Sequence, residues 1–206
     1  MNSYQEEQLE ALIQVREQLM RMDPSTCSRL KNEIQPYLDF RLRLEGFLRD
    51  HLGKYCSQAC FKSQTSACCS KDGIITFWAD VVINAVCCDE IDFAALEAAI
   101  KKPVYQNKCI YLADKGCLWK VRPLVCAMFV CEKVQMEVIN QNAVVKESWE
   151  MHRKCAKSFR WPDKPVLFDR LETIFMDLGC QSPLMYINNS PGLLRVKQKA
   201  GLTSTS

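Results

Sequence analysis

The sequence lacks several features that would assign the protein to a common functional class. It contains no run of about 20 apolar residues, the length needed to cross a bilayer. It has seven glycines among 206 residues, and neither a glycine-rich phosphate-binding loop nor an H-E-x-x-H motif is present. Its 27 basic and 24 acidic residues are mixed along the chain. No basic patch for nucleic acid or a membrane surface is therefore predicted.

The first residues also lack the signals of export. Residues 1–8 contain no basic segment followed by an apolar segment, which a secretory signal peptide would have. We therefore expect a cytoplasmic protein. In the reducing cytosol, clustered thiols indicate metal binding or redox chemistry, and an odd count of 13 cysteines fits a disulfide framework poorly.

Cysteine is the residue that the sequence has in abundance, and eight of the 13 form two blocks. The two histidines, His51 and His152, lie outside both blocks, so an ion held here would be bound mainly by thiolates. Thiolate sulfur selects zinc, copper(I) or iron-sulfur clusters over magnesium or calcium. The first block consists of Cys56, Cys60, Cys68 and Cys69, and the second of Cys109, Cys117, Cys126 and Cys131.

The positions of these cysteines along the expected helices indicate which of them are the stronger candidate ligands. Cys56 and Cys60 are four residues apart, so that both thiols would share one face of a helix. Cys126 follows Pro123, which favours the first position of a helix, where the helix dipole stabilises a thiolate. We therefore expect Cys126 to be the strongest ligand. Cys131 would point about 140° away on the same helix, and it joins the site only if that helix is distorted or begins later.

The other cysteines and Arg122 have more ordinary interpretations. An adjacent pair such as Cys68 and Cys69 can supply two ligands to one site only from irregular backbone. The pair at 87–88 ends an apolar run and is expected to be core. Arg122 is either a donor to a thiolate sulfur or part of a surface salt bridge. Three isolated cysteines are expected to be packed or surface thiols: Cys27, Cys155 and Cys180.

The two blocks together resemble the YkgJ-type cysteine-cluster family, which is described as zinc- or iron-chelating. The family pattern is C-x2-C-x2-C-C, then a single cysteine, then C-x-[IV]-Y-x2-R-P-x2-C. The resemblance covers roughly residues 54–131, and the chain departs from the pattern in its first spacing, C-x3-C-x7-C-C, and at Leu118-Trp119. The matching residues are Cys56, Cys60, Cys68 and Cys69 for the first element, Cys109 for the second, and Cys117, Arg122, Pro123 and Cys126 for the last.

The resemblance implies a metal- or iron-sulfur-cluster-binding protein with a structural, redox or carrier role. Flagellin lysine methylases carry a similar cysteine arrangement, so a cluster-dependent methyltransferase is a second interpretation. A third is a zinc-stabilised module whose N-terminal helices bind a protein partner or a second copy of the chain. Zinc ribbons and knuckles are commonly built from C-x2-C pairs, which this sequence lacks. We therefore narrowly favour an iron-sulfur cluster over zinc.

Apolar spacing predicts a mainly α fold. We expect an N-terminal helical hairpin over residues 1–53, with a turn at 23–26, a kink or break at Pro36 and a stop at Gly53. A cysteine-cluster domain with a loop-rich centre and packing helices is expected over residues 54–183, with helix over most of 124–180. Residues 184–206 are expected to form a C-terminal tail.

Overall fold

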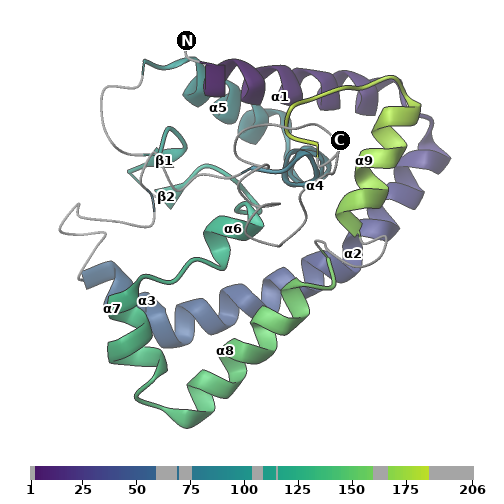
Figure 1. The fold of residues 1–206 in the computed structure, drawn as a ribbon. Helices are drawn as coiled ribbons and strands as arrows, with labels where there is room; N and C mark the ends of the chain where they lie inside the picture. Colours follow the sequence, from purple (N-terminus) through teal and green to yellow (C-terminus); the bar gives the residue numbers. More distant parts are fainter. Residues whose placement is uncertain are drawn as a thin grey trace, which may run out of the picture.

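The computed structural model is mainly helical, as the sequence predicts (Figure 1). The described part of the chain contains helices and one two-stranded sheet. No helix in this part is both long and apolar enough to span a membrane. Two predicted ligands, Cys60 and Cys68, and the predicted tail after residue 185 lie outside the described residues. These residues are 3–58, 69, 76–103, 109–114, 116–159 and 167–185.

The chain begins with two long helices joined by a short turn, α1 (Ser3–Arg21) and α2 (Pro24–Phe47). Asp23 ends the turn as the N-cap of α2, because its carboxylate accepts hydrogen bonds from the main-chain N–H groups of Ser25 and Thr26, both at 3.0 Å. The two helices diverge from this turn (Figure 1), and α1 packs on α4 and α5 while α2 packs on α8 and α9.

The predicted stop at Gly53 is wrong, and of the kink or break predicted at Pro36 the break does not occur. Pro36 lies inside a continuous α2, and the chain stays helical through a π-helix (Leu48–Leu52) into α3 (Gly53–Cys56). The buried side of α2 packs against the core from Leu30 to Phe47, and this packing outweighs the hydrogen bond that proline removes. That side carries Leu30, Ile34, Tyr37, Phe40, Leu44 and Phe47.

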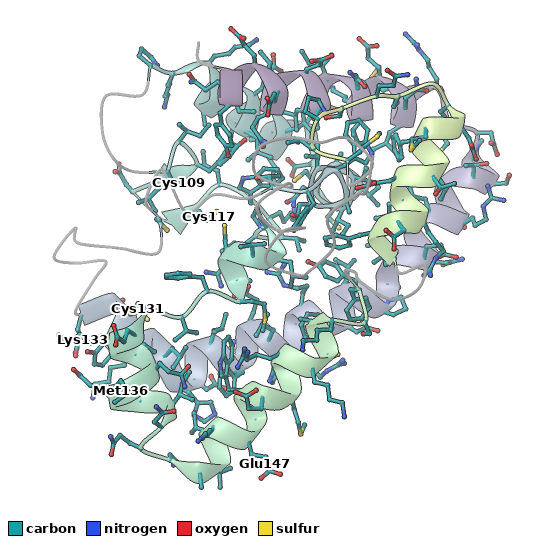
Figure 2. The ribbon with its side chains drawn as sticks, viewed as in Figure 1. Cys109, Cys117, Cys131, Lys133, Met136 and Glu147 are labelled. Atoms are coloured by element: carbon teal, nitrogen blue, oxygen red, sulfur yellow. The ribbon has the colours of Figure 1, made fainter. Side chains whose placement is uncertain are left out.

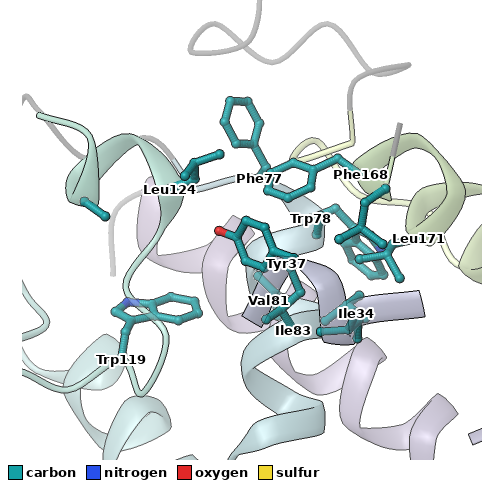
Figure 3. Packing of buried hydrophobic residues seen from close by; sticks show 14 of the residues in the cluster. Ile34, Tyr37, Phe77, Trp78, Val81, Ile83, Trp119, Leu124, Phe168 and Leu171 are labelled. Carbon is teal, nitrogen blue, oxygen red and sulfur yellow. The ribbon is translucent and has the colours of Figure 1, made fainter. Parts of the chain in front are cut away.

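The centre of the core is α4 (Trp78–Cys87), in which every residue from Trp78 to Asn84 is buried. It packs on α1 and on α9 (Leu167–Asp177). Figure 3 shows side chains of α2, α4 and α9 meeting in this core, among them Tyr37, Trp78 and Phe168. The N-terminal helices and the helices after residue 76 thus share one hydrophobic cluster.

Short elements follow α5 (Glu90–Lys101). Strands β1 (Leu112–Ala113) and β2 (Gly116–Cys117) form an antiparallel hairpin. The expected helix over 124–180 is divided into α6 (Leu124–Ala127), α7 (Glu132–Val134), a π-helix (Gln135–Ile139), α8 (Ala143–Ala156) and α9. The chain turns after α9 at Gly179, whose φ of 84° lies in the left-handed region that glycine favours.

Two buried polar side chains of α4 attach the segment 121–124 to the core. The Asn84 amide donates to the carbonyl of Val121 at 2.6 Å and accepts from the N–H of Val121 at 2.9 Å. The Asp80 carboxylate accepts from the N–H of Leu124 at 3.1 Å. These bonds satisfy main-chain groups that would otherwise be buried without partners. They also fix the backbone immediately before Cys126.

We predict that Asn84→Ala lowers the free energy of unfolding by about 1–3 kcal/mol, because it leaves both polar groups of Val121 without their partner. Asn140→Ala is the control, because Asn140 is exposed and its side-chain hydrogen bonds are made on the surface. That variant should stay within about 0.5 kcal/mol of the wild type. Urea denaturation measures both, and equal stability of the two variants would contradict the proposed attachment.

Candidate metal centre

A cavity of about 630 Å³ lies between the β-hairpin, α3, α6 and α7. Six of the eight cysteines predicted as ligands line it, and they come from both blocks of the sequence. The remaining two, Cys60 and Cys68, lie outside the described residues. Cys117 is exposed and the other five cysteines are partly buried. The six are Cys56, Cys69, Cys109, Cys117, Cys126 and Cys131.

The backbone directly connects the two blocks. The N–H of Cys109 donates to the carbonyl of Cys69 at 2.8 Å. Cys109 lies just before β1, and Cys117 on β2 pairs with Leu112 in the hairpin register. Gly116 permits the close turn before Cys117, because its φ of 120° is strained for any residue with a side chain. Cys69 and the hairpin therefore meet at the cavity wall.

Main-chain N–H groups donate to two of the sulfur atoms. The sulfur of Cys109 accepts from Tyr111 and Leu112, and the sulfur of Cys117 accepts from Trp119. Burial raises the pKa of both thiols, and these hydrogen bonds oppose the rise because they stabilise the anionic sulfur. Main-chain N–H donors of the hairpin and of Trp119 thus lie next to sulfur atoms that could become thiolates.

Cys126 and Cys131 line the same cavity because the helix that holds Cys126 is very short. Pro123 is the N-cap of α6, which ends at Ala127, and Cys131 is the N-cap of α7. The side chains of Cys126 and Cys131 are therefore not set about 140° apart, as they would be on one continuous helix. The sequence admits Cys131 to the site only if the helix is distorted or begins later; in the structure one helix ends at Ala127 and a second begins at Glu132.

In the protein without metal, burial outweighs the stabilisation of a Cys126 thiolate that is expected from the helix dipole. Burial, and after it the charge of the Asp80 carboxylate, raise the pKa of Cys126 from 9.0 to about 12. Since α6 has a single turn and its first N–H already donates to Asp80, little of a dipole is left to act on the sulfur. Burial likewise raises the pKa of Cys109 to about 11.

Of the two roles that the sequence leaves open for Arg122, the structure shows the salt bridge. Its guanidinium pairs with both carboxylate oxygens of Glu45 on α2, at 2.8 and 3.0 Å. Its charge also lowers the pKa of the Cys117 and Cys126 thiols, opposing the effect of burial. The buried Arg41 holds this pair in place, because it donates both to Glu45 at 3.1 Å and to the carbonyl of Arg122.

The cysteines outside the two blocks do not line this cavity. Cys87 ends α4 and Cys88 caps it, and both are partly buried. Cys180 is buried, while two other isolated cysteines, Cys27 and Cys155, are partly buried. Neither histidine lines the cavity: His51 contacts Phe47, with 4.9 Å between ring centroids, and Nδ1 of His152 lies 2.7 Å from the carbonyl of Ser148.

The six thiols share a cavity without forming a closed coordination shell. Among the described residues, no three Cys, His, Asp or Glu side chains are close enough together to hold one ion.

Sequence reasoning also missed the polar residues that position the cavity wall, Arg41, Glu45, Asp80 and Asn84. The last two lie four residues apart in an apolar run, a pattern that indicates buried polar partners.

No family model, curated protein or solved structure matches the chain in comparisons with known proteins. The likeness to the YkgJ-type family therefore stays a prediction from the cysteine pattern.

We predict that the metal-free protein loses stability as the pH rises from about pH 9 to pH 11. In this window the unfolded chain releases protons from its thiols, while burial keeps Cys109 and Cys126 protonated in the native state. Each such thiol contributes a slope of at most about 1.4 kcal/mol per pH unit. Chemical denaturation across this pH range measures the slope.

The matched variants are Cys126→Ala and Cys155→Ala. The first removes a buried titrating thiol and should flatten the decline, whereas the second removes a thiol outside the cavity and should leave the decline as in the wild type. Identical slopes for the two variants would show that burial of Cys126 does not control the alkaline loss of stability.

Proposed function

We propose that this protein is a cytoplasmic, thiolate-ligated metal protein of the YkgJ type, with an iron-sulfur cluster narrowly favoured over zinc. The observation that carries the proposal is the meeting of six cysteines from two distant sequence blocks around one cavity. Each of them belongs to the set that the sequence pattern selects as ligands. The role of such a centre is structural, redox or that of a carrier.

The chemistry of the donor set supports this assignment. Four sulfurs complete either a tetrahedral zinc site or an iron-sulfur cluster, and the cavity wall supplies more than four. Thiolates at one site repel one another, and the hairpin N–H donors together with the Arg122 guanidinium offset this negative charge. Zinc or iron held by sulfur fits the site better than a hard cation, which prefers oxygen ligands.

Loading of this centre requires local rearrangement and loss of protons. The raised pKa values of Cys109 and Cys126 mean that both are neutral thiols near pH 7 in the free protein. A metal ligand must be a thiolate, so binding releases these protons to water. Since no three candidate ligands among the described residues surround a common point, binding must also draw the sulfurs together. Metal binding would therefore order the cavity wall.

Purification without oxygen should give a brown protein that contains iron and acid-labile sulfide. Elemental analysis and an absorption spectrum test this expectation, because a cluster gives visible charge-transfer bands and zinc gives none. Stoichiometric zinc without visible bands would reject the iron-sulfur version and leave a zinc protein. Protein that binds neither metal when iron, sulfide and zinc are supplied would reject the proposed function.

The cavity predicts which cysteines matter for metal content. Cys126→Ser should lower the metal bound per protein and the thermal midpoint of the loaded protein, because it removes a thiolate and opens a coordination position. Cys155→Ser is the matched control, because Cys155 lies on α8 outside the cavity, and it should keep the wild-type metal content. Metal analysis of the two variants, side by side, decides whether the cavity is the metal centre; equal contents would place it elsewhere.

A further inference from the structure

The backbone places two cysteines of the cavity, one from each sequence block, directly beside each other. The main-chain nitrogen of Cys109 lies 2.8 Å from the carbonyl oxygen of Cys69, to which its N–H donates. With standard bond lengths on both sides of this hydrogen bond, the two Cα atoms are at most about 6.7 Å apart. Disulfides join cysteines whose Cα atoms are about 4.4–6.8 Å apart. The main chain therefore holds Cys69 and Cys109 within the span of a disulfide bond.

The side chains of this pair face a space that a small molecule can enter. Cys69 and Cys109 both line the cavity, and both are reduced and partly buried. The cavity reaches the surface, because Cys117 on its wall is exposed and Phe129 is 49% exposed. Figure 2 shows Cys131 beside α7, well apart from Cys109. Cys131 is therefore too far away to replace Cys69 as the partner of Cys109.

We propose that Cys69 and Cys109 form a reversible disulfide when the metal-free protein meets a low-molecular-weight disulfide such as oxidised glutathione, and that this bond prevents loading of the metal centre. The second part rests on the proposed function. In the cytosol, where thiols are kept reduced, a protein disulfide is commonly transient and redox-sensing. The pair would thus make metal loading depend on the thiol–disulfide balance around the protein.

The reaction consists of two thiol–disulfide exchanges. The thiolate of one cysteine attacks the small disulfide, so that a mixed disulfide forms and one small thiol leaves. The thiolate of the other cysteine then attacks the mixed disulfide at the protein sulfur, and the second small thiol leaves. Two cysteine thiols are oxidised to one disulfide, the small disulfide is reduced to two thiols, and these thiols carry away the two protons.

A disulfide between Cys69 and Cys109 opposes metal binding in two ways. A metal ligand must be a thiolate, so the bond removes two sulfurs from the donor set. Binding must also draw sulfurs together, because no three candidate ligands among the described residues surround a common point. A covalent link between two of these residues restricts that movement. A bound metal would conversely protect both sulfurs from oxidation, because it occupies the electron pairs that attack a disulfide.

The first experiment maps the disulfide without any metal. The reduced, metal-free full chain is titrated with oxidised glutathione, unreacted thiols are alkylated, and peptide mass spectrometry identifies the linked cysteines. The first link to form should be Cys69–Cys109 in the wild type and in the control variant Cys155→Ser, and it should be absent from Cys69→Ser. A first link between other cysteines, such as Cys109 and Cys117, or the formation of mixed disulfides only, would overturn the inference.

The second experiment measures Zn²⁺ affinity by competition with a chromogenic chelator. Loss of an outer partner of a ligand commonly weakens metal binding by about 10–100-fold, so loss of two sulfurs should weaken zinc binding to the oxidised wild type by at least about tenfold. Dithiothreitol should restore the affinity of the reduced protein. Treatment of Cys69→Ser with oxidised glutathione should leave the zinc affinity of that variant unchanged. Thermal midpoints of the metal-free variants check that each one folds.

The two experiments separate failure of this inference from failure of the proposed function. Oxidised wild type that carries the link but binds zinc as tightly as the reduced protein would overturn the control of metal loading. Absence of the link would overturn the inference even if zinc binds. Reduced wild type that forms the link on oxidation but binds neither zinc nor iron would instead reject the proposed function and, with it, the control of loading.

Discussion

The architecture of the cavity depends on the attachment of one irregular segment to the most buried helix of the fold. Residues 121–124 have no long helix or strand of their own, and the side chains of Asp80 and Asn84 supply their hydrogen-bond partners from α4. Arg41 holds the same segment from the side of α2. Because these groups are buried, breaking one bond leaves an unpaired polar group in the core. The segment before Cys126 is therefore held rigidly.

Opposing electrostatic effects act on the thiols of the cavity wall. Burial and the neighbouring carboxylate of Asp80 favour the neutral thiol at Cys126, whereas Arg122 and the hairpin N–H groups favour thiolates at the positions they reach. In the protein without metal, burial dominates. A bound cation would reverse this balance, because its charge is the largest in the site and deprotonates its thiol ligands.

The sequence predicted some elements well because their signals are local. Asp23 caps α2 through bonds to residues two and three positions away, and Gly179 supplies a left-handed turn after α9. The stop at Gly53 and the break at Pro36, one of the two alternatives for that residue, do not occur; both expectations come from rules for isolated helices. In the fold, the apolar side of α2 packs along the core, and this contact outweighs the preference of single residues.

By itself the sequence determined which ligating groups the protein has, clustered thiols with few histidines. It also determined the mainly helical class of the fold. The tertiary structure decided which thiols meet, because Cys69 and Cys109 are joined by a backbone hydrogen bond across 40 residues that no periodicity encodes. It also decided the protonation of Cys126, since the pKa of a thiol depends on burial and on charges such as Asp80 that are distant in sequence. Such long-range contacts exist only in the folded chain.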